Sequence, residues 1–238
     1  MGRPGETRVA TLIAFHHAGG GASFFSRLGV PPGLPIALQP VQLPGREDRW
    51  DEAPAASVQA AAEDAIERLP AGAHEPCLLY GHSLGALVAF EVAHLLGERH
   101  DEKPAALIVS AEPAPHLASA QRLTGLSDAE IWAEMSALGG VPAPLAESAD
   151  FRTFFIGRVR ADIGLYDNYV CRVRNPLGCP ILAFGGLEDG SVSEHELLAW
   201  REHTTGAFSV TLLDGGHFFI VDAWETLLRA AATFAGEP

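Results

Sequence analysis

The chain has 238 residues, 47% of them hydrophobic, which suits a single globular unit with a sizeable core. Its formal net charge of -14 argues against binding to nucleic acid or to an anionic membrane surface, because both require clustered Lys and Arg. No apolar run has the length of a transmembrane helix or the pattern of a signal peptide. Three cysteines without a C-x-x-C pair favour a reducing, cytoplasmic setting.

The first half of the chain alternates between predicted strands and helices. Apolar runs predict strands over 9–15, 36–42, 77–80 and 105–110. Ser57 is a predicted N-cap for an amphipathic helix that ends near Leu69. The helix over 86–96 is apolar nearly all round, which indicates burial, and Gly97 is expected to end it.

The last third of the chain returns to the same alternation. Strands are predicted over 180–184 and 208–213, and Ser193-x-x-Glu196 is a capping-box pattern between them. A final helix carries Trp224, Leu227, Leu228, Ala231 and Phe234 at helical spacing. We therefore predict an α/β fold with a mostly parallel central sheet and helices on both faces.

The stretch between the two halves contains no convincing strand. Ser127-x-x-Glu130 opens a helix closed by Gly139-Gly140, and the next helix is indicated by Phe151, Phe155 and Val159. We predict that 115–175 is a helical lid insertion between core segments 1–114 and 176–238. A helical layer without a gating role is the alternative. Phe151, Phe155 and Tyr166 are candidates to line an acyl tunnel, or to form the lid's own core.

Residues 81–85 (Gly-His-Ser-Leu-Gly) match the G-x-S-x-G pattern between a predicted strand and a predicted helix. A serine on such a sharp turn is held exposed above the sheet in a strained backbone that only small neighbours permit. Gly81 and Gly85 lack the Cβ atoms that would clash there. Ser83 is the candidate nucleophile.

In this architecture an acid and a histidine follow the serine along the chain, each on a loop after a strand. Asp189 follows the strand over 180–184, and His217 follows the strand over 208–213. His217 would accept the Ser83 proton, and Asp189 would fix the imidazole tautomer. A loop-capping role for His217 is the alternative. Leu84 and Ala18 are the candidate backbone N–H donors to the oxyanion.

Six stretches carry a resemblance that covers nearly the whole chain. They are Phe15 to Gly20, Gln42 to Arg46, Gly81 to Gly85, Arg160 to Asp162, Tyr166 and Gly215 to Phe219. In this combination and order the chain resembles the type II thioesterases of polyketide and nonribosomal peptide assembly lines, which have the α/β-hydrolase fold. The resemblance implies hydrolysis of acyl thioesters on the phosphopantetheine arm of a carrier protein, typically to remove aberrant acyl groups. It implies the triad Ser83, Asp189 and His217, the donors Ala18 and Leu84, and no cofactor or metal.

Two positions depart from the family pattern. His16 and Gly190 stand where proline is common. Related thioesterases embedded in synthases place their acid one strand earlier, so Glu112 is a rival to Asp189 as the triad acid. The short ends around the core lead us to expect a free-standing monomer.

Docking of an acidic carrier protein to this acidic chain is expected to need a local basic patch. The candidates are Arg152, Arg158, Arg160, Arg172 and Arg174, with solvated or ion-paired arginines as the alternative. Arg46 and Arg49 are expected to form structural ion pairs.

Several other functions use the same residues or compete with them. A small-molecule carboxylesterase, a product-releasing thioesterase and an acyltransferase would all employ the same triad. A non-catalytic binding protein is disfavoured because every triad position is filled. A metal hydrolase is disfavoured because the chain has no His-Glu-x-x-His.

Overall fold

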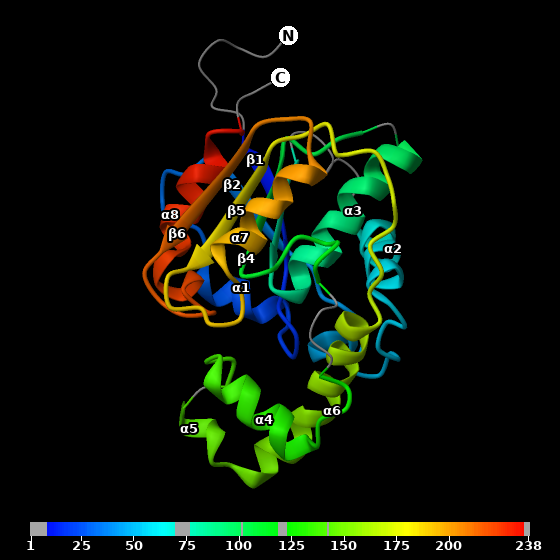
Figure 1. The fold of residues 1–238 in the computed structure, drawn as a ribbon, viewed down its shortest axis with the longest axis vertical. Coiled ribbons are helices and arrows are strands. Elements are labelled where there is room, and N and C mark those ends of the chain that lie inside the picture. Colours follow the sequence, from blue (N-terminus) through cyan, green and yellow to red (C-terminus); the bar gives the residue numbers. More distant parts are fainter. Residues whose placement is uncertain (1–8, 70–76, 101, 119–122, 142, 236–238) are drawn as a thin grey trace.

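The computed structural model describes residues 9–69, 77–100, 102–118, 123–141 and 143–235 (Figure 1). Within these residues one six-stranded sheet has the order β2-β1-β3-β4-β5-β6, and every neighbouring pair of strands is parallel. The strands are β1 (Ala10–Phe15), β2 (Ile36–Pro40), β3 (Cys77–His82), β4 (Ala106–Ser110), β5 (Ile181–Gly186) and β6 (Phe208–Leu213). The predicted parallel α/β sheet is confirmed.

Helices cover both faces of this sheet. One face packs against α1 (Ala22–Leu28) and α8 (Ile220–Ala232), which contribute Phe25 and Trp224 to its core. The opposite face packs against α2 (Val58–Arg68), α3 (Leu84–His100) and α7 (Glu194–Leu198). Two short 3₁₀ helices, η1 (Glu47–Arg49) and η2 (Ala199–His203), lie in the connections.

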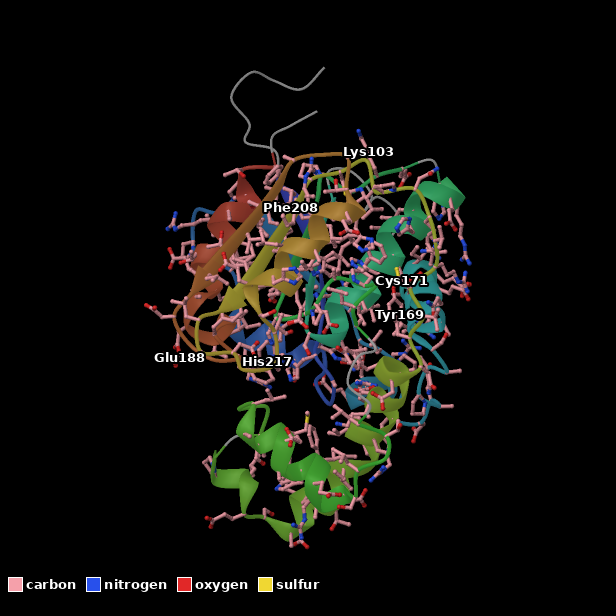
Figure 2. The ribbon with its side chains drawn as sticks, viewed as in Figure 1. Lys103, Tyr169, Cys171, Glu188, Phe208 and His217 are labelled. Carbon is pink, nitrogen blue, oxygen red and sulfur yellow. The ribbon has the colours of Figure 1, made fainter. Side chains whose placement is uncertain are left out.

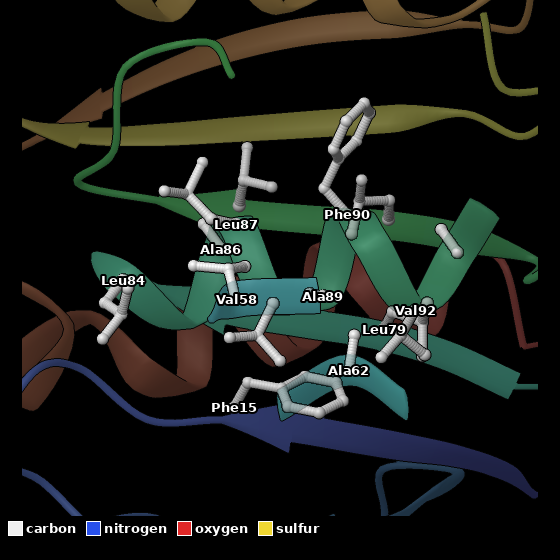
Figure 3. Close-up of a cluster of buried hydrophobic side chains, with 14 of the residues drawn as sticks. Phe15, Val58, Ala62, Leu79, Leu84, Ala86, Leu87, Ala89, Phe90 and Val92 are labelled. Atoms are coloured by element: carbon white, nitrogen blue, oxygen red, sulfur yellow. The ribbon is translucent and has the colours of Figure 1, made fainter. Parts of the chain in front are cut away.

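Helix α3 is the centre of the larger core. All its residues from Leu84 to Leu96 are buried, as the uniformly apolar sequence predicts. Figure 3 shows Leu84, Leu87 and Phe90 on this helix in one cluster with Phe15 of β1, Leu79 of β3 and Val58 of α2. Each such side chain stabilises the fold by roughly 1.5 to 3 kcal/mol through burial. The turn that precedes α3 is therefore joined to a helix that is held firmly in the core.

The predicted helix starts agree with the structure. The Ser57 hydroxyl accepts the Ala60 N–H at 3.0 Å, and full capping boxes form at Ser127 and Ser193. The prediction that Gly97 ends α3 is wrong, because the helix runs to His100 and Gly97 has no positive φ. An interior glycine costs a helix only about 1 kcal/mol. Phe234 lies two residues beyond α8, within the usual uncertainty of helix ends.

The segment between β4 and β5 is helical, as predicted, and forms no strand in its described residues. It contains α4 (Asp128–Ala137), α5 (Ala143–Ala146) and α6 (Ala149–Asp167), and we call residues 115–175 the insertion. Figure 1 shows these helices projecting from the core at the end where the strands finish. Ile131, Val159 and Ile163 form their small separate core. In the described parts of the chain, no helix is long and apolar enough to cross a lipid bilayer.

Candidate active site

The turn from β3 into α3 holds Ser83 in a strained conformation. Ser83 has φ 53, a left-handed backbone angle that few non-glycine residues adopt. A Cβ on Gly81 would overlap the carbonyl oxygen of Gly85, and a Cβ on Gly85 would overlap that of Phe15. The predicted need for glycine at both positions is confirmed. The Ser83 N–H donates to the Ser110 carbonyl at 2.8 Å, which ties the turn to β4.

His217 and Asp189 form a hydrogen-bonded pair on the loops that follow β6 and β5. The His217 Nδ1–H donates to Asp189 Oδ2 at 2.9 Å, and both side chains are buried. Burial acts to raise the pKa of Asp189, but hydrogen bonds from His217 and Ser191 outweigh it and hold the pKa below its ordinary value. An ionised Asp189 keeps the proton on Nδ1, so that Nε2 is free to accept one.

Ser191 is a site residue that the sequence analysis missed. Its hydroxyl donates to Asp189 Oδ1 at 2.5 Å, its N–H donates to the same oxygen at 2.9 Å, and its Oγ lies 3.0 Å from His217 Nδ1. The Asp-x-Ser spacing was the available signal, since an aspartate commonly accepts hydrogen bonds from residues two positions further on. Ser191 therefore orients both members of the pair.

Among the described residues, Glu112 forms no hydrogen bond with His217, which the triad acid would have to do. Its side chain borders the same cavity as Tyr166, and its Oε1 has no hydrogen-bond partner among the described atoms. Burial, followed by the charges of Asp189 and Glu196, raises its pKa well above the ordinary range. The carboxylate that holds the imidazole in this structure is that of Asp189.

Ser83 and His217 line the same two adjoining cavities. The larger, of about 130 Å³, is walled by apolar side chains of the core and the insertion, among them Leu84, Leu123, Met135 and Ile163. The smaller, of about 40 Å³, is bordered by Phe155 and Phe218. Figure 2 shows His217 at the end of the sheet that faces the insertion, whereas Lys103 and Phe208 mark the opposite end. The strand ends thus bring the predicted nucleophile and base to one site.

The glycine-rich loop, residues 16–21, borders the same cavities through Ala18. Gly20 N–H donates to the His17 carbonyl at 3.0 Å, and Gly19 N–H donates to Asp162 Oδ2 at 2.7 Å. Asp162 lies on α6, so the insertion fixes the loop that carries Ala18. Leu84 opens α3, where the first N–H groups have no intrahelical acceptor. Both predicted donors therefore lie beside Ser83.

Three neutral histidines surround the site without belonging to the pair. Burial, followed by the charges of neighbouring Arg46 for His16 and His16 for His17, lowers the pKa of each to about 3. Burial also lowers the pKa of His82 well below its usual value, and its Nδ1 lies 2.8 Å from Ser110 Oγ. The rings of His17 and His82 pack edge-on, 6.0 Å apart. The ring of His82 also lies 5.3 Å from that of His217.

Comparison with known proteins decides the family. A family model described as a thioesterase domain matches residues 10–234. The chain belongs to the thioesterase family. It is 33% identical to the thioesterase PikA5 of Streptomyces venezuelae over 94% of this chain and 80% of that protein.

Solved structures agree. The RedJ thioesterase of the prodiginine pathway in Streptomyces coelicolor superposes with a TM-score of 0.85 at 33% identity, covering 98% of this chain and 90% of that one. The type II thioesterase BorB of the borrelidin cluster superposes with a TM-score of 0.87 at 33% identity, covering 98% and 95%. The resemblance to type II thioesterases and the fold it implied are confirmed.

The aromatic candidates of this thioesterase divide into two groups. Tyr166 borders the larger cavity and Phe155 the smaller one. Phe151 stacks on Phe155, with ring centroids 5.2 Å apart, and is not among the described residues that border either cavity. Tyr166 and Phe155 thus border the cavities that Ser83 lines, and Phe151 packs against Phe155.

The arginines of the thioesterase have several different environments. Arg160 pairs with Asp128, and Arg174 pairs with the buried Glu91 at 2.9 Å. Arg158 lies over the Trp50 ring, 4.7 Å from its centroid. Among the described residues Arg152 and Arg172 have no ion-pair partner, and both are exposed.

The predicted structural roles of Arg46 and Arg49 are confirmed. Arg46 forms a buried pair with Asp162 at 2.7 Å. Arg49 binds Asp64 at 2.6 Å and Glu52 at 2.5 Å.

Proposed function

We propose that this thioesterase hydrolyses acyl thioesters from the phosphopantetheine arm of carrier proteins, as a free-standing editing enzyme of polyketide or nonribosomal peptide biosynthesis. One observation carries the proposal. Ser83 on its strained turn shares a cavity with His217, whose Nδ1 is hydrogen-bonded to Asp189. The similarity to type II thioesterases supports the substrate class.

The proposed chemistry begins with acylation of Ser83. His217 Nε2 takes the hydroxyl proton while Oγ attacks the thioester carbonyl carbon, and the ionised Asp189 stabilises the resulting imidazolium. The N–H groups of Leu84 and Ala18 stabilise the negative charge on the carbonyl oxygen. The carbon–sulfur bond then breaks, and the phosphopantetheine thiol leaves with the proton held by His217.

Deacylation repeats these steps of proton transfer, attack and bond cleavage, with water as the nucleophile. His217 removes a proton from the water that attacks the acyl carbon, and returns it to Ser83 as the carboxylic acid leaves. The neutral histidines beneath the turn keep the surroundings free of competing charge. No metal or cofactor is required for any of these steps.

In this proposal the insertion acts as a lid over the acyl chain. It supplies Met135, Leu138, Ile163 and Tyr166 to the larger cavity, so an acyl group on Ser83 would be covered partly by insertion side chains. Opening of α4 away from the core would admit the substrate.

Arg152 and Arg172 are the best remaining carrier-docking candidates, because Arg160 and Arg174 already neutralise acidic partners. Reversing both charges should raise KM for an acyl carrier protein. It should leave the kinetics unchanged for a small thioester that cannot use the docking surface. We keep the expectation of a cytoplasmic monomer as part of this proposal, since an intracellular synthase would supply the substrate.

The test compares an acyl carrier protein with an oxygen ester of the same acyl group. The proposal expects thioester hydrolysis to be much the faster reaction, with free acid as the product and with Ser83→Ala inactive but folded. Faster cleavage of the oxygen ester would indicate a carboxylesterase. A transferred or cyclised product in place of free acid would indicate an acyltransferase or a product-releasing enzyme.

A further inference from the structure

The end of β4 places an acidic side chain in the cavity that also holds Ser83. His82 of β3 pairs with Ser110 of β4, and Glu112 follows Ser110 by two residues. Glu112 borders the larger cavity together with Ser83 and Tyr166. Adjacent strands lie only about 4.8 Å apart. Glu112 therefore lies beside the first part of an acyl chain attached to Ser83.

The carboxyl group of Glu112 is buried and incompletely satisfied. The residue is 2% exposed, and its backbone carbonyl accepts the Trp200 indole N–H at 2.9 Å. Its side chain borders the cavity beside Tyr166, and its Oε1 has no hydrogen-bond partner among the described atoms. Buried polar atoms normally have hydrogen-bond partners, and an exception calls for an explanation. Because Glu112 borders the cavity, a small rotation of its carboxyl group would bring this oxygen to a ligand group there.

The environment of Glu112 determines what that partner is. Burial and the nearby carboxylates of Asp189 and Glu196 raise the pKa of Glu112 well above its ordinary value, which favours the neutral acid. A neutral carboxylic acid has one O–H donor in addition to its acceptor oxygen. Glu112 borders the cavity beside Tyr166, so the neutral acid can donate one hydrogen bond to a group inside it. Apolar side chains, including Leu123, Met135 and Ile163, make up most of the other walls.

We propose that Glu112, supported by Tyr166, selects acyl groups that carry an uncharged oxygen on the chain, either a hydroxyl or a ketone. This inference rests on the proposed thioesterase function and adds the substrate class. An oxygen on the chain accepts the Glu112 proton, whereas an unsubstituted hydrocarbon chain leaves the acid without a partner. A cationic amine on the acyl chain would pair well only with an ionised Glu112, and the carboxylates of Asp189 and Glu196 oppose that ionisation.

The experiment measures thiol release from N-acetylcysteamine thioesters of hexanoic acid and of 3-, 4- and 5-hydroxyhexanoic acid. For the wild-type chain we expect at least one hydroxy substrate to exceed hexanoyl in kcat/KM by about tenfold, the value of one hydrogen bond. Glu112→Leu should bring that ratio close to one. Glu112→Gln is neutral and keeps an N–H donor, so it should retain most of the preference.

Three controls keep the outcomes distinct. Glu67→Leu makes the same chemical change on the exposed side of α2 and should leave the ratio as in the wild type. Thermal unfolding of Glu112→Leu should show little loss of Tm, because a buried carboxyl oxygen without a partner is replaced by apolar atoms. A 3-aminohexanoyl thioester tests the cationic alternative and should be the poorest substrate.

A preference that survives in Glu112→Leu, the absence of any preference for a hydroxy substrate, or a preference for the amino substrate would each overturn this inference. In those cases hexanoyl hydrolysis would still support the proposed function. Failure of the folded wild-type chain to hydrolyse every thioester tested would instead remove the proposed function itself.

Discussion

Asp162 on α6 and Arg46 in the loop after β2 form a buried ion pair that joins the insertion to the core. Both Nη–Oδ distances are 2.7 Å, across 116 residues of sequence, and the side chains are 0% and 1% exposed. The same carboxylate accepts the Gly19 N–H at 2.7 Å. One side chain of the insertion thus holds both an arginine of the core and the loop that carries the Ala18 donor.

Asp162→Asn should lower both stability and turnover. The change leaves the Arg46 charge buried without a counter-charge, which costs on the order of 3 to 5 kcal/mol. Urea unfolding would measure the loss of stability, and kcat on an acyl thioester would measure the displacement of the glycine-rich loop.

The double variant Arg46→Leu with Asp162→Leu separates the two effects. Apolar replacement of a buried ion pair is often neutral for stability, so the free energy of unfolding should recover. The Gly19 N–H would still lack its acceptor, so kcat should stay low. Full recovery of kcat would show that Asp162 has no role in positioning the loop.

Asp189→Asn should reduce kcat by several orders of magnitude, because the amide no longer favours the productive imidazole tautomer. Glu188→Gln is the matched control, since Glu188 is the adjacent, exposed acid. Steady-state kinetics on one acyl thioester would test both variants. Near-normal turnover of Asp189→Asn, together with an inactive Glu112→Gln, would assign the acid to Glu112.

Ser191→Ala should lower kcat/KM by severalfold to about tenfold, since it removes one hydrogen bond to a charged group. The Ser191 bonds help to hold the Asp189 pKa low. Without the hydroxyl that pKa rises, so activity should begin to fall at a higher pH on the acidic side of the profile. A pH–rate profile identical to that of the wild type would exclude this positioning role.

Gly85→Ala should prevent folding or sharply reduce Tm, because its Cβ would overlap the Phe15 backbone. Gly157→Ala is the control, for which we expect a gain of stability instead of a loss. Nothing lies within 4 Å of a Cβ at that helical position. Alanine there should stabilise the protein by roughly 0.5 to 1 kcal/mol. Circular dichroism melts of the two variants provide the comparison.

The buried histidines should make the protein sensitive to acid. The pKa of His16 and of His17 is about 3 in the folded chain, below the 6.5 of an ordinary histidine, so the unfolded chain binds more protons in between. Stability should therefore be complete above about pH 6.5 and fall as the pH drops toward 3, by about 1.4 kcal/mol per unit for each histidine.

Urea titrations between pH 7 and 4 would measure this dependence. A His17→Phe variant should have a shallower slope than the wild type, whereas His195→Gln, at an exposed position of α7, should not change it. An unchanged slope in His17→Phe would contradict the assignment of a neutral, buried His17.

Local signals in the sequence predicted most of the fold and the centre of the site. Ser57, Ser127 and Ser193 each accept a hydrogen bond from a residue three positions later, so their capping patterns can be recognised in the sequence alone. The nucleophile turn is equally local, since its glycines and Ser83 are neighbours. The helix end predicted at Gly97 is wrong because tertiary burial of α3 outweighs the weak local preference of one glycine.

The parts that were missed depend on contacts between distant segments. The Asp162–Arg46 pair and its bond to Gly19 join three separate regions, and no periodicity reveals such a meeting. The arginine candidates could not be sorted for the same reason, because Arg174 reaches Glu91 on α3 and Arg160 reaches Asp128 on α4. Glu112 stood out by its position after β4, but only the fold shows that it faces the cavity beside Ser83.

The most direct test of the account is the covalent labelling of the chain by a fluorophosphonate, followed by mass spectrometry of its peptides. We predict a single modified site at Ser83 in the wild-type chain, and its loss in His217→Ala, because the hydroxyl then has no base. Labelling at another residue, or equal labelling of Ser83 in the wild type and in His217→Ala, would contradict the account.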